Sequence, residues 1–215
     1  MNLTMTESTT DHIIYVNAPG RINLIGEHTD YNDGYAMPAA VDKSIKFKIS
    51  KNRTSDLCTV EAKDFNAKTS FYLHNFKPSD SSWVNYVLGV VSEIQKVTNK
   101  LKSFHCEISS TLPVGSGMSS SAALECGFAT ALNELFHLEF STRQIIDIAY
   151  HAERNFVGTK CGIMDQFASV MGEKTKLLFL DCKTLDYQSL SLNLAPYELV
   201  LLNTGVSHSL LDGDY

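Results

Sequence analysis

The sequence predicts an α+β fold in which a mixed or antiparallel sheet is packed by helices. Residues Ser44–Ser50 alternate strictly, with Ile45, Phe47 and Ile49 on one face, as in a half-buried strand. Residues Trp83–Val97 change period, because their apolar side chains recur at three- and four-residue steps, as in an amphipathic helix. The expected strands gather ahead of the helices without strict alternation, which disfavours a doubly wound sheet.

The first third of the chain is expected to be strand and loop. Residues 1–11 are rich in Thr and Ser and are expected to be frayed. A short strand over Ile13–Val16 is expected to stop at Asn17–Gly20, and residues 17–35 mix glycines with charged and amide side chains, which is typical of a loop. After Ser44–Ser50, two further strands are expected at Leu57–Ala62 and Thr69–Leu73.

The remainder is expected to be mainly helical. Residues Phe104–Ser109 alternate as a strand, and Ser119–Phe136 form a helix that leaves a glycine loop. Ser141 is a suitable N-cap for a helix through Arg154, whose apolar face holds four residues, Ile145, Ile146, Ile148 and Ala149. Gly162 opens a short helical stretch, and strands are expected at Leu177–Leu180 and Tyr197–Asn203.

Composition narrows the class of protein. A chain of 215 residues with 44% hydrophobic content holds one large domain, or one domain and part of another. The net charge of −6 is the reverse of the basic surplus of nucleic-acid-binding proteins. No apolar stretch approaches the ~20 residues of a membrane span, and the N-terminus lacks the features of a signal peptide. Five cysteines without a CxxC pair indicate buried thiols in a reducing compartment. We therefore expect a cytoplasmic protein without nucleic-acid or membrane partners.

The segment Thr111–Ala123 has the features of a phosphate-binding loop. Gly115 and Gly117 let backbone N–H groups approach an anion, and the following helix adds its N-terminal donors. Three successive serines, Ser119, Ser120 and Ser121, add hydroxyls for phosphate oxygens or a metal. No Lys follows Gly117 and no third glycine is present, so the segment is neither a Walker A loop nor a dinucleotide fingerprint. A tight, well-capped turn is the alternative reading, and the serines favour phosphate.

The segment Pro19–Asn32 concentrates polar side chains. A cation, two carboxylates, an imidazole and two amides lie within one short stretch, which suits a polyhydroxylated ligand. A solvated loop with local Asx turns is the alternative. Glu27-His28 does not begin an HExxH metal motif, because residue 31 is Tyr.

Two further acidic residues are candidates for chemistry. Asp165, in Cys161–Phe167, is either a charge that favours a helix N-terminus or a carboxylate held ready as a base. Glu153 stands near the end of the preceding helix, before an expected flexible loop over Asn155–Lys160. With a Ser hydroxyl it would offer hard oxygen ligands for Mg²⁺, although an exposed helix-end Glu is the alternative. Trp83, Asn85 and Tyr86 would form an aromatic wall for a base, although Trp83, at helical spacing, is more often a core residue.

Together, these segments resemble the galactokinase branch of the GHMP small-molecule kinases. Gly20–Tyr31 is similar to the sugar-binding signature, Pro113–Ala123 to the phosphate loop, and Cys161–Gln166 to the segment that carries the catalytic Asp. All three occur in the family's order. Ser116 and Met118 replace the commoner small residue and Leu, and both keep size and backbone freedom. The fold that the resemblance implies is the ribosomal protein S5 domain 2-like N-terminal domain of these kinases.

The resemblance implies ATP-dependent phosphorylation of the C1 hydroxyl of galactose, giving galactose 1-phosphate and ADP. Asp165 matches the base, and Arg21 the cation that orients it. The implied sugar contacts are Glu27, His28, Thr29, Asp30, Gly162 and Tyr215. The implied ATP contacts are Gly115, Ser116, Gly117, Met118, Ser119, Ser120 and Ser121, with Trp83 and Tyr86 near the adenine. The implied Mg²⁺ ligands are Ser121 and Glu153.

Family members continue well past residue 215. We therefore expect residues 1–195 to form the N-terminal domain, and residues 196–215 to hold the first strand and the start of a C-terminal domain that is otherwise absent. A chain truncated in this way is expected to turn over little substrate and to self-associate, whereas the complete protein is expected to be monomeric.

Two other functions stay open. One is a related GHMP kinase for another substrate, such as N-acetylgalactosamine or a non-sugar alcohol; the cluster Glu27–Asp30 disfavours the non-sugar members. The other is a sensor that binds galactose and ATP to regulate transcription without turnover. Such sensors carry lesions in the Ser-Ser-Ala part of the phosphate loop, and here Ser120–Ala123 is intact, which favours an enzyme.

Overall fold

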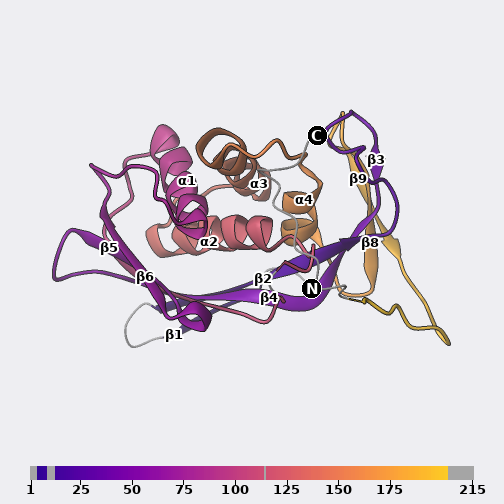
Figure 1. The fold of residues 1–215 in the computed structure, drawn as a ribbon, viewed down its shortest axis with the longest axis horizontal. Coiled ribbons are helices and arrows are strands. Elements are labelled where there is room, and N and C mark those ends of the chain that lie inside the picture. The colour runs from indigo at the N-terminus through magenta and orange to yellow at the C-terminus, as the bar shows by residue number, and fades with distance from the viewer. Residues whose placement is uncertain (1–3, 9–12, 114, 203–215) are drawn as a thin grey trace.

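The computed structural model describes residues 4–8, 13–113 and 115–202. A six-stranded sheet carries a layer of helices on one face, and a smaller sheet stands at one end beside helix α4 (Figure 1). The helices are α1 (Ser82–Val97), α2 (Ser120–Phe136), α3 (Thr142–His151) and α4 (Met164–Met171). The predicted α+β class is confirmed. Over the described residues, no helix is both long and apolar enough to cross a membrane.

The large sheet is mixed. Its order is β1 (Thr4–Ser8), β2 (Ile13–Asn23), β4 (Pro38–Lys51), β7 (Phe104–Ser110), β5 (Leu57–Ala62) and β6 (Ala67–Tyr72). The neighbours are antiparallel except β5 and β7, which run parallel. The small antiparallel sheet has the order β3 (Tyr35–Ala36), β8 (Lys176–Asp181) and β9 (Tyr187–Ser191).

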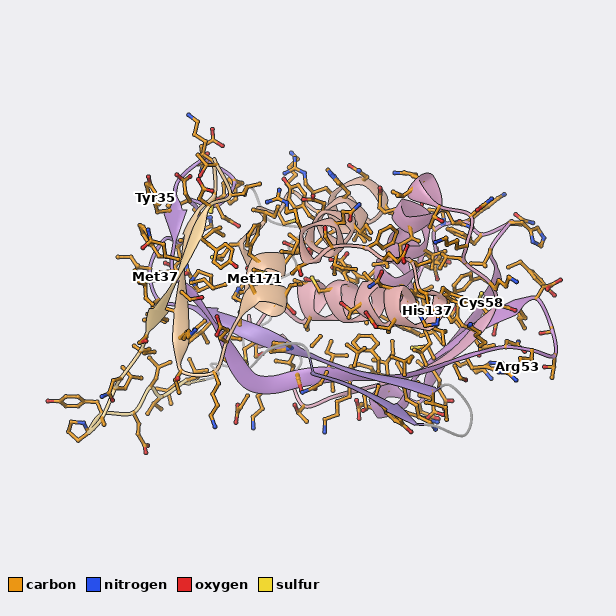
Figure 2. All side chains as sticks on the ribbon, turned by 180° about the vertical axis from the view of Figure 1, so that it is seen from behind. Tyr35, Met37, Arg53, Cys58, His137 and Met171 are labelled. Carbon is orange, nitrogen blue, oxygen red and sulfur yellow. The ribbon has the colours of Figure 1, made fainter. Side chains whose placement is uncertain are left out.

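The core lies between the large sheet and the helices, where side chains fill the space (Figure 2). Ile45, Phe47 and Ile49 of β4 are buried there, as their alternation predicts. Helix α2 lies directly on β2 and β4 at Gly127, where any side chain would overlap the Phe47 ring. The small residues of α2 therefore bring the start of this helix, and the loop before it, close to the sheet.

Strand β2 is longer than expected. The prediction that it stops at Asn17–Gly20 is wrong, because β2 continues to Asn23 with a change of register against β4 between Pro19 and Arg21. Such irregularities bend a strand and re-aim its side chains. The loop expected over residues 17–35 is therefore confined to residues 24–34. The N-terminal residues are also not simply frayed, since Thr4–Ser8 pair with β2 as β1.

The other differences concern short or exposed elements. Strands β3 and β9 were not expected: β3 has two residues, and every residue of β9 is exposed, so neither has a burial pattern to detect. The strand expected at Tyr197–Asn203 is not formed over residues 197–202, whose apolar side chains are exposed. Asn203 lies outside the described residues.

The helix expected from Ser141 to Arg154 divides into two parts. Ser141 is its N-cap, with a capping box in which the Ser141 hydroxyl accepts from Gln144 N–H and Gln144 reaches back to the Ser141 backbone. After His151 the chain continues as a π-helix, η2 (Ala152–Val157), rather than entering a flexible loop at Asn155. Single π-helical turns are rare and frequent at functional sites.

Candidate functional site

A cavity of about 570 Å³ lies where β2, the loop after it, the loop before α2 and the start of α4 meet. Its lining includes Arg21, Glu27, Asp30, Gly117, Gly162 and Asp165. The three sequence segments expected to carry chemistry thus converge on one place, and the volume suits a small-molecule ligand.

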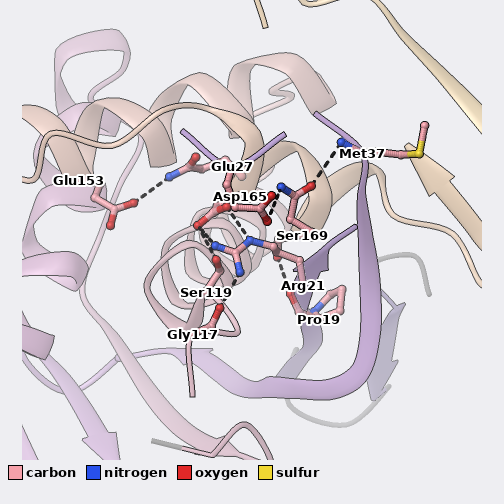
Figure 3. Close-up of polar contacts among 11 residues, drawn as sticks. Pro19, Arg21, Glu27, Met37, Gly117, Ser119, Glu153, Asp165 and Ser169 are labelled. Carbon is pink, nitrogen blue, oxygen red and sulfur yellow. Dashed lines mark hydrogen bonds and ion pairs between the residues drawn. The ribbon is translucent and has the colours of Figure 1, made fainter. Parts of the chain in front are cut away.

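Arg21 and Asp165 form a two-point ion pair across 144 positions of sequence (Figure 3). Arg21 Nε donates to Asp165 Oδ1 at 2.6 Å, and Arg21 Nη2 donates to Oδ2 at 2.7 Å. The remaining guanidinium nitrogen donates to the Gly117 carbonyl at 2.6 Å, and the Ser119 hydroxyl also donates to Asp165. The two side chains of the pair are 17% and 25% exposed, so they are sheltered yet open to the cavity. Bidentate pairs of this kind fix orientation as well as charge.

Close backbone contacts bring these two residues together. A Cβ on Gly20 would lie 2.5 Å from a Leu112 methyl and 2.6 Å from the Met118 carbonyl oxygen, so only glycine lets β2 touch the loop before α2. Arg21 N–H donates to that same Met118 carbonyl. On the other side, the Ser169 hydroxyl of α4 donates to the Pro19 carbonyl at 2.9 Å (Figure 3).

The loop before α2 has the backbone of an anion cradle. Gly115 and Gly117 both have φ of 68°, and Ser119 has φ of 54°, so the loop turns through the left-handed region three times. Ser119 precedes the helix but does not cap it, because its hydroxyl bonds Asp165 instead. The first N–H groups of a helix have no partner within the helix, so those of α2 stay available to a ligand.

Asp30 lies directly against Gly162. A side chain on Gly162 would overlap the Asp30 carboxylate, so glycine at this position is a condition for the site. Burial first, and the nearby charge of Asp165 second, raise the pKa of Asp30 above its usual value. Asp30 is therefore a partly desolvated acceptor beside the Arg21–Asp165 pair.

The other residues of the loop after β2 divide into cavity-facing and structural groups. Glu27 accepts from the Asn23 amide at 3.1 Å, and the His28 ring bonds the Tyr31 hydroxyl; both Glu27 and His28 line the cavity. Thr29, predicted as a sugar contact, donates its hydroxyl to the carbonyls of Gly26 and Tyr35 at 2.7 Å and does not line the cavity. Its visible role is to hold the loop in shape.

Glu153 is buried, only 2% exposed, so the alternative of an exposed helix-end Glu is wrong. It accepts from the Gln166 amide at 2.8 Å (Figure 3), and the Ser121 hydroxyl is near enough to its carboxylate to favour the charged form. Burial, and next the charge of Asp165, raise the pKa of Glu153 to about 7.

The oxygens of Ser121 and Glu153 fit a divalent cation. Hydroxyl and carboxylate oxygens side by side are the hard donors that Mg²⁺ prefers. No group of three or more His, Cys, Asp or Glu side chains suited to a metal occurs in the described part of the chain. Mg²⁺ commonly uses one or two protein oxygens together with waters and substrate phosphates, so this pair is compatible with it.

The two predicted adenine contacts do not line the cavity. Trp83 and Tyr86 lie on α1, pack against the core and do not line the cavity. Tyr86 lies near Thr159 and Glu153, and burial raises the pKa of its hydroxyl. Their place beside an adenine stays a prediction. Tyr215 lies outside the described residues.

The sequence reading missed two residues, Glu125 on α2 and Gln166 on α4, both 0% exposed. The signal for Glu125 was present, because it stands within a helix whose neighbouring residues are apolar or small on every side, and such a helix is buried. The burial of Glu153 was also readable, since it continues the four-residue stripe of Ile145 and Ala149.

Comparison with known proteins agrees with this geometry. The family model for the GHMP kinases N-terminal domain matches residues 85–173, and the model for the galactokinase galactose-binding signature matches residues 6–51. The galactokinase of Thermosipho africanus is 42% identical over 200 residues, which cover 93% of this chain and 55% of that protein. The galactokinase of Actinobacillus pleuropneumoniae is 38% identical over 217 residues, covering 98% and 56%.

Solved structures show the same fold. The Lactococcus lactis galactokinase complexed with galactose superposes with a TM-score of 0.83 at 34% identity, covering 87% of this chain and 49% of that one. The Methanococcus jannaschii mevalonate kinase, at 21% identity and a TM-score of 0.68, shares the fold. The chain spans about half the length of the curated relatives it matches. In sequence and in fold, the chain matches the N-terminal portion of galactokinases.

Proposed function

We propose that the complete protein is a galactokinase, which transfers the terminal phosphoryl group of ATP to the C1 hydroxyl of galactose. The observation that carries the proposal is the convergence on one cavity of the Arg21–Asp165 pair, the phosphate-binding loop and Asp30. Phosphoryl transfer depends mainly on positioning and electrostatic stabilisation, and these groups supply both.

Asp165 is the general base of this proposal. Its carboxylate opens onto the cavity and is held by two Arg21 nitrogens and the Ser119 hydroxyl, so its remaining lone pairs have a defined direction. It accepts the proton of the sugar hydroxyl as that oxygen attacks phosphorus. Arg21 stays charged throughout and stabilises the negative charge that builds on the transferring group.

The sugar is bound by the polar side chains around the other half of the cavity. Asp30, Glu27 and His28 offer acceptors and a donor to several hydroxyls at once. Asp30 is the strongest of these candidates, because it is partly buried and fixed against Gly162. A sugar that leaves Asp30 unpaired would be rejected.

The nucleotide phosphates are bound by the loop Gly115–Ser121, through its backbone N–H groups and the start of α2. Ser121 and Glu153 would hold Mg²⁺, which neutralises phosphate charge when bound. In this proposal residues 1–195 form the N-terminal domain, residues 196–215 begin a C-terminal domain, and the use of ATP favours a cytoplasmic location.

The test is an ATP-dependent assay of the full-length protein with galactose, N-acetylgalactosamine, glucose and mevalonate. We expect turnover with galactose, and a phosphate at the anomeric carbon by ³¹P NMR. Turnover of N-acetylgalactosamine alone would redirect the proposal to a related kinase. Saturable binding of galactose and ATP with no product would indicate a sensor and overturn the enzyme assignment.

A further inference from the structure

The loop between the π-helix η2 and helix α4 forms one wall of the cavity. The cavity lining includes four of its residues, Thr159, Lys160, Cys161 and Gly162. At the start of this loop, the Gly158 and Thr159 N–H groups donate to the Glu153 carbonyl at 3.0 and 3.1 Å. Residues 158–163 belong to no helix or strand, so the shape of the loop depends on contacts from other elements.

Arg154 makes such a contact. Its Nη1 donates to the Cys161 carbonyl at 2.9 Å and to the Tyr150 hydroxyl at 3.0 Å. The guanidinium also lies over the Tyr150 ring, 5.4 Å from the ring centroid. Because Nη1 carries two hydrogens, it can serve both acceptors at once. The Tyr150 side chain, one turn earlier on α3, therefore aims the guanidinium at the loop, although Arg154 is exposed.

The carbonyl that Arg154 holds lies directly before the tightest contact of the sugar side. A Cβ on Gly162 would overlap the Asp30 carboxylate and lie 2.8 Å from the Asp30 carbonyl carbon. The Gly162 backbone thus packs against both the side chain and the main chain of Asp30. Close-packed groups transmit small displacements, because no free space absorbs them. The position of the Cys161 carbonyl therefore affects the position of the Asp30 carboxylate.

We propose that Arg154 is a positioning residue for the sugar, which fixes the backbone of Cys161 and Gly162 and, through it, the Asp30 carboxylate. This inference rests on the proposed function, because it takes Asp30 as a sugar contact. Arg154 is not among the described residues that line the cavity, so it acts through the loop rather than by touching the sugar. A general attraction of its charge for phosphates would instead favour the nucleotide. The two roles differ in which substrate is affected when the guanidinium is removed.

Two substitutions in the full-length protein test this role. Arg154→Met keeps an unbranched apolar side chain but removes the charge and every hydrogen-bond donor. Arg143→Met is the matched control, because Arg143 is also exposed, bonds Asp147 at 3.0 and 3.2 Å and lies over the Phe167 ring. Arg143 thus makes the same kinds of contact as Arg154, and none of these contacts involves the loop after η2.

The first measurement is the steady-state kinetics of galactose phosphorylation. We expect Arg154→Met to lower kcat/KM for galactose ~10-fold and to leave KM for ATP within about twofold of the wild type, because only the sugar is misplaced. Arg143→Met should match the wild type for both substrates. In an Asp30→Ala background, Arg154→Met should lower kcat/KM for galactose by less than about twofold, because the carboxylate that it positions is gone.

The second measurement needs no substrate. Hydrogen exchange of the ligand-free protein, followed by mass spectrometry on peptides that cover residues 158–162, reports how readily the loop opens. We expect faster exchange of these amides in Arg154→Met and wild-type exchange in Arg143→Met.

Several outcomes would overturn the inference. They are wild-type kcat/KM for galactose in Arg154→Met, an equal effect on KM for ATP, an undiminished loss in the Asp30→Ala background, or a similar loss in Arg143→Met. Unchanged exchange of residues 158–162 in Arg154→Met would show that Arg154 does not hold the loop. A wild-type protein that neither binds nor phosphorylates galactose would refute the proposed function, and the sugar role of Arg154 with it. The exchange result would still decide whether Arg154 holds the loop, so the two failures are distinguishable.

Discussion

Two acidic sites lie side by side in the helical layer and differ in what each carboxylate faces. Asp165 faces a guanidinium at 2.6 Å, at the wall of an open cavity. Glu153 faces a second acid, Glu125, and is sealed from solvent. The first site stabilises a negative charge with a cation of the chain itself. The second opposes ionisation by burial, and in the proposed reaction it would gain from a cation that arrives with the nucleotide.

The difference indicates why the two acids have separate tasks in the proposed reaction. A base must reach the substrate and stay oriented, which the Arg21 contacts and the cavity provide. A cation ligand need not touch the sugar, and burial protects it until the phosphates arrive.

The largest effect is expected for Asp165→Asn. The amide keeps the shape of the side chain but cannot accept the proton, so kcat for galactose phosphorylation should fall ~10²–10⁴-fold. Nucleotide affinity in the presence of Mn²⁺ should change little, because the cation site is separate. Near-normal kcat in a folded variant would remove Asp165 as the base.

Gly162→Ala should disrupt the sugar side of the open site. The new methyl group overlaps the Asp30 carboxylate, and a displacement of that size costs ~10²-fold in kcat/KM for galactose. Asp30→Ala should raise KM for galactose far more than KM for ATP. In an Asp30→Ala background, Gly162→Ala should then add little, because its target is gone. Additive losses would show that Gly162 acts on something other than Asp30.

The sealed site should be visible in the pH dependence of stability. The pKa of Glu153 is raised from 4.5 to about 7, so the folded protein holds a proton that the unfolded chain releases over this range. The contribution of Glu153 to the free energy of unfolding is greatest at low pH and is lost as the pH rises from 4.5 to 7. In EDTA, the free energy of unfolding of the wild type should fall by about 2 kcal/mol between pH 5 and pH 8. The Glu153→Gln variant should not show this fall.

The control for that experiment is Ser141→Ala, which removes the capping-box hydroxyl from α3. Neither Ser141 nor Gln144 titrates, so this variant should lose about 1 kcal/mol equally at both pH values. Urea denaturation of the three proteins gives the comparison. Parallel pH profiles for the wild type and Glu153→Gln would mean that Glu153 ionises without cost, contrary to its burial.

Local patterns predicted the elements whose two faces differ. Ser44–Ser50 and Phe104–Ser109 alternate because one side of the sheet is covered by helices, and Trp83–Val97 shows a helical stripe for the same reason. The predicted strand ended before the observed end of β2, because Pro19 and Gly20 ordinarily interrupt strands. In the structure, a change of register against β4 accommodates Pro19 and Gly20, and the close contacts of Gly20 with Leu112 and Met118 favour glycine there. No local sequence pattern indicates either feature.

The candidate site was partly readable in the same way. Polar loops and a glycine-rich helix start identified Arg21, Asp30 and Asp165 separately, and the family resemblance joined them. Arg21 forms two hydrogen bonds with Asp165, and these depend on a fold that brings positions 144 residues apart into contact. The sequence did not identify Glu125, because the role of a single acid in an apolar helix depends on the residue that it faces. In the structure that residue is Glu153.

The π-helical turn Ala152–Val157 constrains how this segment can diverge. Its hydrogen bonds reach one residue further than those of an α-helix, so it acts as a stored one-residue insertion. Deleting one residue would restore the α-helical pitch and rotate the following backbone by about 100°, carrying Gly162 away from Asp30. A substitution at the exposed Asn155 leaves that geometry intact, whereas Arg154 donates to the Cys161 carbonyl beside Gly162. In this stretch, length is therefore under tighter constraint than residue identity, and gaps between relatives should avoid it.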